Sequence, residues 1–329
     1  MTLIISSEDD LSTNDVIDWM LHYNMPFVRI NGTTNISVTS IEINNENIVD
    51  VELILDDNYN KNRQLKLSSI QSVWYRRGGI NVNMLKPVIN CLDDNEMNQL
   101  REYLKNEKRE LEFVIYALLK KKKHINTFHD DDRNKLHTLM IAKECGLKIP
   151  DTIITSFQEK YTSMSAKHKS LITKGIRHGC VTFKDKILGG GTCLIDLSTQ
   201  HNLPNYFFPS LLQENLKKKY EIRSFYIHGN FYSIAIFSQL DEQTSIDFRN
   251  YNEKKPNRTP PFEIPLDIQQ RLKLLMNKLD INCGSIDIIV TTDNEFVFLE
   301  VNPVGQFTQV SIPGNFFLEK QITNFLRND

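Results

Sequence analysis

Long apolar segments are missing from this chain of 329 residues. A transmembrane helix needs ~20 consecutive apolar residues, so none is expected. The N-terminus has a short apolar run followed at once by acidic residues, with no basic segment before it, and does not predict a signal peptide. The net charge of −2 gives no sign of nucleic-acid or membrane binding. The composition therefore predicts a soluble globular protein, and the length suits two or three domains.

The chain also has few cysteines and lacks two common phosphate-binding motifs. The five cysteines are odd in number and show no CxxC spacing, which predicts free thiols in the cytoplasm rather than disulfides or a zinc site. The Walker sequence GxxxxGKS/T and the dinucleotide fingerprint GxGxxG are both absent. Their absence disfavours a P-loop nucleotide site and a Rossmann dinucleotide site.

The first third of the chain contains both strand and helix patterns. Residues 3–6, 10–22 and 25–31 predict a strand, a helix and a strand, the opening of a Rossmann-like domain. A long helix is expected from Asp93 or Asp94 to Lys122, because acids at its start and lysines at its end complement the helix dipole. Three segments between these elements predict the strands of a β-meander: 36–43, 49–55 and 72–77.

The most informative segment is 284–302. It consists of SIDIIV, a polar turn and FVFLEVN, and predicts a β-hairpin. With a two-residue turn at 293–294, Asp287 lies across from Glu300, and Asn302 follows on the same face. Two carboxylates opposed inside an apolar hairpin repel one another and are costly to bury. A divalent cation would remove that cost, and an all-oxygen set suits Mg²⁺ or Mn²⁺ better than zinc. The alternatives are a solvent-facing pair or one protonated acid.

Four basic residues could contact phosphate. Lys174 ends an apolar strand, from which its charge can reach a nucleotide phosphate. Lys135 begins a helix, where a cation is unfavourable, so a nearby phosphate or solvent exposure would explain it. Arg223 and Arg249 could stabilise charge on a transferred phosphoryl group, or form surface salt bridges. The lysine run 217–219 is interpreted as a solvated face.

A glycine-rich tract surrounds the segment CVTFKDKIL. Its backbone N–H groups could cover phosphates as a mobile flap, although a flexible hairpin loop would need no ligand. The glycines are Gly175, Gly179, Gly189, Gly190 and Gly191.

Taken in order, residues 130–310 resemble the ATP-grasp superfamily, in particular its RimK-like branch. The segments that carry the likeness are NKLHTLMIAKECGLKIP, LITKGI, LLQENL, EIRSF, DFRN and IDIIV followed by FLEVNP. The resemblance implies an α+β, ATP-grasp fold with ATP and Mg²⁺ as cofactors. It also implies three parts: a Rossmann-like N-terminal domain (1–125), a central α+β domain with the flap (126–212) and a C-terminal antiparallel-sheet domain with the metal site (213–329).

The same resemblance assigns roles to individual residues. Lys135 and Lys174 would hold the phosphates, and Arg249, with Arg223, would stabilise the acyl phosphate. The other implied roles are adenine contacts from Gln213, Glu214, Asn215 and Leu216, a ribose contact from Glu221, and metal ligation by Asp287, Glu300 and Asn302. The RimK-like branch often has Asp in place of Glu221.

A narrower resemblance is carried by SVWYRRGG (72–79) and EVNPVGQF (300–307). These segments are similar to the ATP-grasp maturases of graspetides, the microviridin-type peptides, and to their grasp-with-spasm subgroup. In that family an Asp or Glu side chain of a ribosomally made precursor peptide is phosphorylated by ATP. A Ser or Thr hydroxyl or a Lys amine then attacks it and closes a macrocyclic ester or amide. The implied partner is therefore a precursor peptide, and a homodimer is plausible. The alternative to a solvated face for the lysine run 217–219 is that the loop-rich region 217–256 takes part in recognising this peptide.

Three alternatives stay open. A RimK-like ligase that adds free amino acids to a protein or a small molecule would share every ATP residue. A non-catalytic module that binds nucleotide or peptide is disfavoured by the complete metal set and by Arg249. A kinase-like phosphotransferase would stop at the phosphoryl step.

Overall fold

The computed structural model describes residues 1–45, 50–83, 93–128, 134–177, 180–184, 186–189, 191–195, 203–241 and 252–327. The chain separates into two compact units. Unit 1 is Met1–Asp131 together with Phe317–Asp329, and unit 2 is Asp132–Phe316. Within the described ranges, no helix is long and apolar enough to cross a membrane. The finer division at residues 125 and 212 stays a prediction.

Unit 1 is built on a parallel sheet with the strand order β2-β1-β6-β7. Its strands are β1 (Thr2–Ile5), β2 (Phe27–Ile30), β6 (Ser72–Tyr75) and β7 (Lys123–Ile125). Helix α1 (Leu11–His22) joins β1 to β2, which confirms the predicted β-α-β opening. Helix α2 (Asp94–Lys120) precedes β7 and begins with a capping box between Asp93 and Glu96, as its acidic start suggested.

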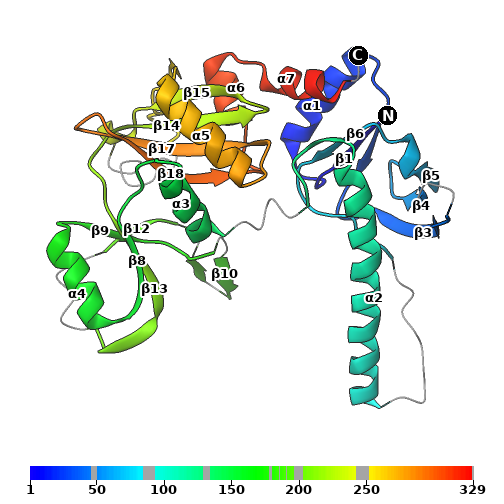
Figure 1. Ribbon diagram of the computed structural model, residues 1–329, viewed down its shortest axis with the longest axis horizontal. Coiled ribbons are helices and arrows are strands. Elements are labelled where there is room, and N and C mark those ends of the chain that lie inside the picture. Colours follow the sequence, from blue (N-terminus) through cyan, green and yellow to red (C-terminus); the bar gives the residue numbers. More distant parts are fainter. Residues whose placement is uncertain are drawn as a thin grey trace. The chain divides into compact units, whose positions relative to one another are not determined.

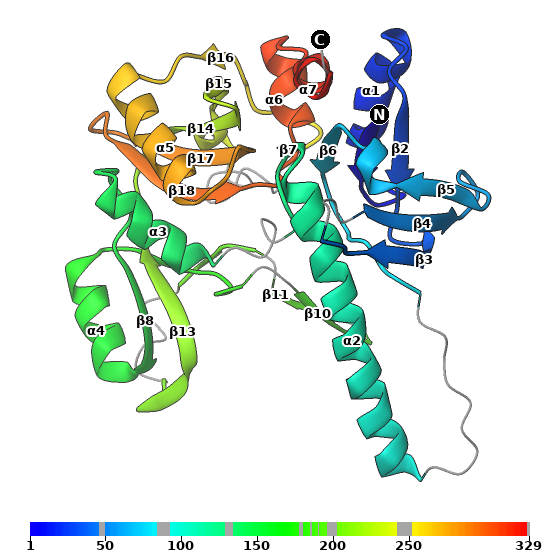
Figure 2. The same ribbon diagram turned by 45° about the vertical axis from the view of Figure 1, so that its right-hand side comes forward.

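The predicted meander is partly wrong. Strands β3 (Asn35–Glu42), β4 (Asp50–Asp56) and β5 (Arg63–Lys66) form an antiparallel sheet, in which they lie side by side (Figure 2). Residues 72–75, expected as its last strand, instead form β6 and pair in parallel with β1. All four residues of β6 are buried, as is typical of a parallel strand covered on both faces. A short 3₁₀ helix, Leu67–Ser69, connects β5 to β6.

The last helix, α7 (Leu318–Leu326), belongs to unit 1, although it follows the whole of unit 2 in sequence. The Thr323 hydroxyl donates to the Val16 carbonyl of α1 at 3.2 Å. The Ser72 hydroxyl of β6 donates to the Leu326 carbonyl at 2.8 Å. The chain therefore returns to complete the unit that it formed first.

Unit 2 contains two antiparallel sheets (Figure 1). The first has the order β12-β9-β13-β8, and α4 (Gln158–Lys167) packs beside β8 and β13. Its strands are β8 (Thr152–Phe157), β9 (Leu171–Thr173), β12 (Cys193–Leu194) and β13 (Tyr206–Glu214). A separate hairpin, β10 (Cys180–Phe183) and β11 (Lys186–Gly189), lies in the glycine-rich tract.

The second sheet of unit 2 has the order β16-β15-β14-β17-β18. Its strands are β14 (Lys218–Ile227), β15 (Asn230–Ile236), β16 (Pro261–Phe262), β17 (Cys283–Thr291) and β18 (Phe296–Asn302). A 3₁₀ helix, Ser238–Leu240, follows β15. The helices of this region are α3 (Lys135–Glu144), α5 (Leu266–Lys278) and α6 (Thr308–Gly314). Strands β14 and β15 form a hairpin, and His228 and Gly229 take positive φ angles in its turn.

Side-chain alternation separates the residues of the second sheet onto two faces. Ile222, Ile286, Ile288 and Phe298 pack with α3 and α5 in a buried core. The neighbouring residues of these strands therefore point to the opposite face, and they include the charged residues of the site.

Candidate functional site

A pocket in unit 2 is lined by residues from both antiparallel sheets. It gathers most of the residues that the sequence singled out. Its lining is Pro150, Ile172, Lys174, Thr192, Gln213, Glu214, Asn215, Leu216, Lys218, Glu221, Asp287, Ile289, Leu299 and Glu300. Residues separated by as many as 150 positions in sequence therefore meet in one place.

Asp287 and Glu300 lie opposite each other as predicted, but a longer turn and a β-bulge bring them together. Asp287 of β17 pairs with Glu300 of β18. The turn is longer than expected, because the Thr291 N–H donates to the Glu295 carbonyl and Asn294 takes a positive φ of 61°. An unbroken ladder from this turn would place Leu299 across from Asp287. A β-bulge between the Asp287 and Ile288 pairs shifts the register by one residue and restores the acidic pair.

The bulge also explains why Leu299 and Glu300 both line the pocket although they are neighbours in sequence. In a regular strand they would point to opposite faces. Val301 then pairs with Ile286 and packs against the apolar core.

Two cations lie beside the acidic pair. Arg223 Nη1 lies 3.4 Å from Asp287 Oδ1 and 3.5 Å from Oδ2. Lys135 Nζ lies 3.2 Å from Glu300 Oε2. Both acids are more than nine-tenths buried, so these cations reduce the cost of burying them. Arg223 therefore forms a buried ion pair within the site, and not the surface salt bridge that was the alternative.

Asn302 lies apart from the acidic pair. It pairs with Ser285, two positions from Asp287, and is exposed. Its Oδ1 accepts from the Val304 N–H at 3.1 Å, so the side chain caps the turn after β18. Asn302 is not part of the pocket lining, and its role as a metal ligand stays a prediction.

Glu221 is buried in the pocket and bound by two neighbours. The Ser238 hydroxyl donates to Oε1 at 2.9 Å, and Lys218 Nζ lies 2.5 Å from the same atom. Burial raises the pKa of Glu221, while Lys218 and Ser238 oppose that shift. The solvated-face interpretation is therefore wrong for Lys218, whose side chain is only 5% exposed. The sequence carried no signal for this contact, because residues three apart on a regular strand point to opposite faces and the contact depends on the irregularity between Lys218 and Tyr220.

Residues 213–216 connect the two sheets and are tethered by their side chains. Gln213 Nε2 donates to the Thr152 hydroxyl at 2.8 Å, and Asn215 Nδ2 donates to the Ser170 hydroxyl at 3.1 Å. Leu216 follows and lines the pocket. The segment expected to contact adenine is thus held at several points.

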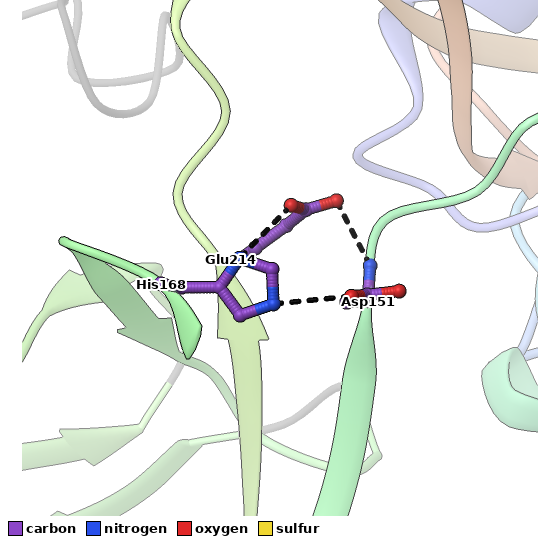
Figure 3. A group of neighbouring side chains, drawn as sticks. All are labelled: Asp151, His168 and Glu214. Atoms are coloured by element: carbon purple, nitrogen blue, oxygen red, sulfur yellow. Dashed lines mark hydrogen bonds and ion pairs between the residues drawn. The ribbon is translucent and has the colours of Figure 1, made fainter. Parts of the chain in front are cut away.

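Glu214 belongs to a cluster with Asp151 and His168 that sequence reasoning missed (Figure 3). His168 Nε2 lies 3.1 Å from Asp151 Oδ2, and Nδ1 lies 3.3 Å from Glu214 Oε2. The Asp151 N–H donates to Glu214 Oε1 at 3.0 Å. The imidazole therefore joins the start of β8 to the end of β13.

This cluster has ligand atoms close enough for a metal ion, but its charges fit an internal clamp better. The Lys167 ammonium also pairs with Asp151 and lowers the pKa of that carboxyl. A cation already at the carboxylate competes with a second cation, and both ring nitrogens of His168 already have carboxylate partners.

Three other predicted features are placed only in part. Lys174 lines the pocket. It directly follows β9, in agreement with its predicted place at the end of a strand. Arg249 lies outside the described residues. Within the flap, residues 178–179, 185 and 190 also lie outside them, so the phosphate-covering role of the glycines stays a prediction.

Comparison with known proteins adds information at the level of the fold. No protein-family model matches the sequence, and no curated protein matches it. Among solved structures, the macrocyclase MdnC from Microcystis aeruginosa MRC, bound with precursor peptide MdnA, has a TM-score of 0.75 and 24% identity, with 99% of each chain covered. A Chryseobacterium gregarium RiPP-associated ATP-grasp ligase, in complex with ADP and a leader and core peptide, has a TM-score of 0.75 and 21% identity. This match covers 99% of this chain and 96% of the ligase.

A more distant likeness is the RimK domain protein ATP-grasp from Sphaerobacter thermophilus DSM 20745, with a TM-score of 0.53, 9% identity and 99% of each chain covered. These structural likenesses extend over nearly the whole chain, including unit 1. The sequence resemblance to the ATP-grasp superfamily covered only residues 130–310. The predicted α+β architecture is therefore confirmed, and this chain has the ATP-grasp fold.

Proposed function

We propose that this chain is an ATP-dependent ligase that forms macrocyclic esters or amides within a ribosomally made precursor peptide. The observation that carries the proposal is the pocket in which Lys174, residues 213–216 and the Asp287–Glu300 pair converge. The fold likeness to a macrocyclase bound with a precursor peptide, and to an ATP-grasp ligase in complex with a leader and core peptide, supports the substrate class. Their TM-scores of 0.75 exceed the 0.53 of the RimK domain protein, which favours this function over free amino-acid addition.

The proposed reaction has two steps. A carboxylate oxygen of an Asp or Glu side chain in the peptide attacks the γ-phosphorus of ATP, and the bond to the β–γ bridging oxygen breaks, releasing ADP. A Ser or Thr hydroxyl or a Lys amine of the same peptide then attacks the acyl carbon. The nucleophile loses a proton and inorganic phosphate leaves. For each ring, the peptide loses the elements of one water molecule.

The residues in and beside the pocket, together with Arg249, would take distinct roles in these steps. Lys174 and Lys135 would hold phosphate oxygens as point charges, residues 213–216 would contact adenine, and Glu221 would contact the ribose. Arg223, beside Asp287, and Arg249 would stabilise negative charge on the acyl phosphate and on the oxyanion formed by attack.

The donor set also fits a hard divalent cation. Asp287 and Glu300 present carboxylate oxygens from paired positions, and oxygen ligands suit Mg²⁺ or Mn²⁺. Such an ion would neutralise charge on the transferred phosphoryl group. Asn302 Oδ1 accepts one hydrogen bond from the Val304 N–H and keeps a second lone pair, through which it would act as a third ligand. Cys145, Cys193 and Cys283 are free thiols, which supports a reducing cytoplasmic location.

Mass spectrometry tests the proposed reaction directly. The chain is incubated with ATP, Mg²⁺ and a small acidic peptide encoded beside its gene, with a reaction lacking ATP as the control. Loss of one water per ring is expected. A mass gain of one amino acid would instead show the RimK-like activity, and a stable phosphopeptide would show a phosphotransferase.

Trapping the intermediate sharpens this test. A peptide whose Ser, Thr and Lys residues are replaced by Ala cannot close a ring. Added hydroxylamine should then convert its acyl phosphate to a hydroxamate on Asp or Glu. An unmodified peptide in both experiments would favour a binding module without chemistry.

Loss of the His168 clamp is expected to weaken ATP binding more than it slows the reaction. Replacing His168 with Asn removes its contacts with Asp151 and Glu214, each worth roughly 1 kcal/mol. The KM for ATP should rise about five- to tenfold while kcat changes little. Steady-state kinetics measure both values.

The matched control is Lys167→Gln. Lys167 pairs with Asp151, as His168 does, but within the described residues it has no ion pair with Glu214. This variant should keep the wild-type KM for ATP. An unchanged KM in the His168→Asn variant would show that the clamp does not position residues 213–216.

A further inference from the structure

The loop Arg76–Gly79 follows β6 at the carboxyl end of the parallel sheet in unit 1. In open parallel sheets, ligands bind outside this edge, because the backbone leaves the strands there and exposes side chains from several loops. Residues 6 and 7, after β1, and Asn31, after β2, belong to the same edge. The ATP pocket of unit 2 leaves this loop without a role.

The backbone of the loop is held firmly. The N–H groups of Arg76 and Arg77 both donate to the Ile5 carbonyl, at 2.8 and 3.2 Å. The Tyr75 hydroxyl donates to the Gly78 carbonyl at 2.6 Å. Gly78 has a φ of +69°, and an added Cβ would lie 3.2 Å from the Ser6 carbonyl oxygen, so the chain needs glycine there. A side chain on this loop therefore starts from a fixed position.

Three arginines lie at this edge, and in two of them the terminal guanidinium nitrogens have structural partners. Each guanidinium nitrogen of Arg29 donates within unit 1, to Asn31, Asn14 and the Ser7 carbonyl, at 2.6 to 2.8 Å. The side chain of Arg76 is only 3% exposed, and its Nε lies 3.0 Å from Asp10 Oδ2. Its Nη2 donates to the Ser12 hydroxyl at 3.2 Å.

Arg77 differs from both. Its Nε lies 3.3 Å from the buried Asp10 Oδ2, and its side chain is 38% exposed. Across the described residues, its two terminal nitrogens, Nη1 and Nη2, have no hydrogen-bond or ion-pair partner. The exposed Asp9 acts on Arg77 through charge alone, without an ion pair. Asp10 thus anchors one side of the guanidinium, and the fork of Nη1 and Nη2 is accessible.

We propose that Arg77 binds an acidic side chain of a peptide substrate, as a bidentate carboxylate site of unit 1. This inference rests on the proposed function, because that function requires a peptide rich in Asp or Glu. A guanidinium presents two parallel N–H donors whose spacing matches a carboxylate, and a prepositioned fork loses less side-chain entropy on binding. Arg77 is a binding residue here and takes no part in the chemical steps.

Arginine-selective labelling of the full chain with phenylglyoxal tests the site. The experiment uses no nucleotide, so it does not depend on the ATP reaction. Peptide mapping should show that Arg77 reacts, while the buried Arg76 does not. A blocked glutamate–glycine repeat peptide should slow labelling of Arg77, and the glutamine–glycine counterpart should not. Arg101, exposed on α2, is the internal control and should react equally in both.

Variants at the same position measure the contribution to binding. By fluorescence anisotropy, Arg77→Gln should weaken binding of the glutamate–glycine peptide about tenfold, and Arg77→Lys should weaken it less, because a lysine keeps the charge without the fork. Circular dichroism checks that both variants fold.

Two results would overturn the proposal. One is wild-type affinity in the Arg77→Gln variant. The other is protection of Arg77 by inorganic phosphate as strong as that by the glutamate–glycine peptide, which would indicate a general anion site. A failure of macrocyclisation with intact protection would instead count against the proposed function alone.

Discussion

Replacing Glu300 with Gln is expected to lower the rate of ATP turnover about a thousandfold while the chain stays folded. Gln has nearly the same size, so the β17–β18 pairing should survive. It removes the negative charge that, in our proposal, binds a metal ion together with Asp287 and that lies 3.2 Å from Lys135. If the ion supplies about 4 kcal/mol of transition-state stabilisation, its loss corresponds to about three factors of ten in rate. Release of ADP measures the rate.

The same hairpin offers a matched control. Glu295 lies near the turn, pairs with Lys148, and has a side chain that is 49% exposed. Glu295→Gln should leave ATP turnover close to that of the wild type. Wild-type turnover in the Glu300→Gln variant would contradict the metal assignment. Equal melting temperatures of the two variants would show that any loss arises at the site and not from unfolding.

The second large effect is expected for Asp10→Asn, which should lower the free energy of unfolding of unit 1 by about 3–5 kcal/mol. The Asp10 side chain is 1% exposed, and its Oδ2 lies 3.0 Å from Arg76 Nε and 3.3 Å from Arg77 Nε. Arg76 is also buried, so the substitution leaves a buried cation without its carboxylate. Removing one partner of a buried ion pair is more costly than the pair itself is stabilising.

The position of the tryptophans makes this measurement specific. The chain has two tryptophans, Trp19 in α1 and Trp74 in β6, and both belong to unit 1. Tryptophan fluorescence during urea unfolding therefore follows this unit. Asp9→Asn, at the exposed neighbouring position, is the control and should change the stability by less than about 0.5 kcal/mol.

A double variant tests whether the lost charge is the cause. Asp10→Asn combined with Arg76→Met removes both members of the buried pair, and it should recover part of the lost stability. If the double variant is as unstable as the sum of the two single variants, the two residues are not coupled. In that case the explanation of the Asp10 effect is wrong.

The acidic pair shows how much of the site was predictable. Strand alternation is a local property, so the sequence placed Asp287 and Glu300 on one face of one hairpin. The assumed two-residue turn was wrong, and the bulge at Leu299 offset the error. Neither feature has a strong local signal here, because bulges depend on how the strand fits its neighbours in the sheet.

Contacts between distant segments were harder to predict. His168 bridges residues 17 and 46 positions away, and no motif marks it. Residues 72–75, expected as a meander strand, pair instead with β1 in a position that buries all four side chains. A fully buried strand and a half-buried strand of four residues look alike in sequence.

The sequence by itself determined the β-α-β opening, the long helix α2, and the facing acids of the β17–β18 hairpin. These follow from periodicity, capping and turn residues, which act over a few positions. The tertiary structure decided that Lys218 is buried against Glu221, that α7 completes unit 1, and that the Arg77 side chain stays partly exposed while Asp10 holds its Nε. These outcomes depend on which strands become neighbours, and the burial of apolar faces far apart in the chain selects those neighbours.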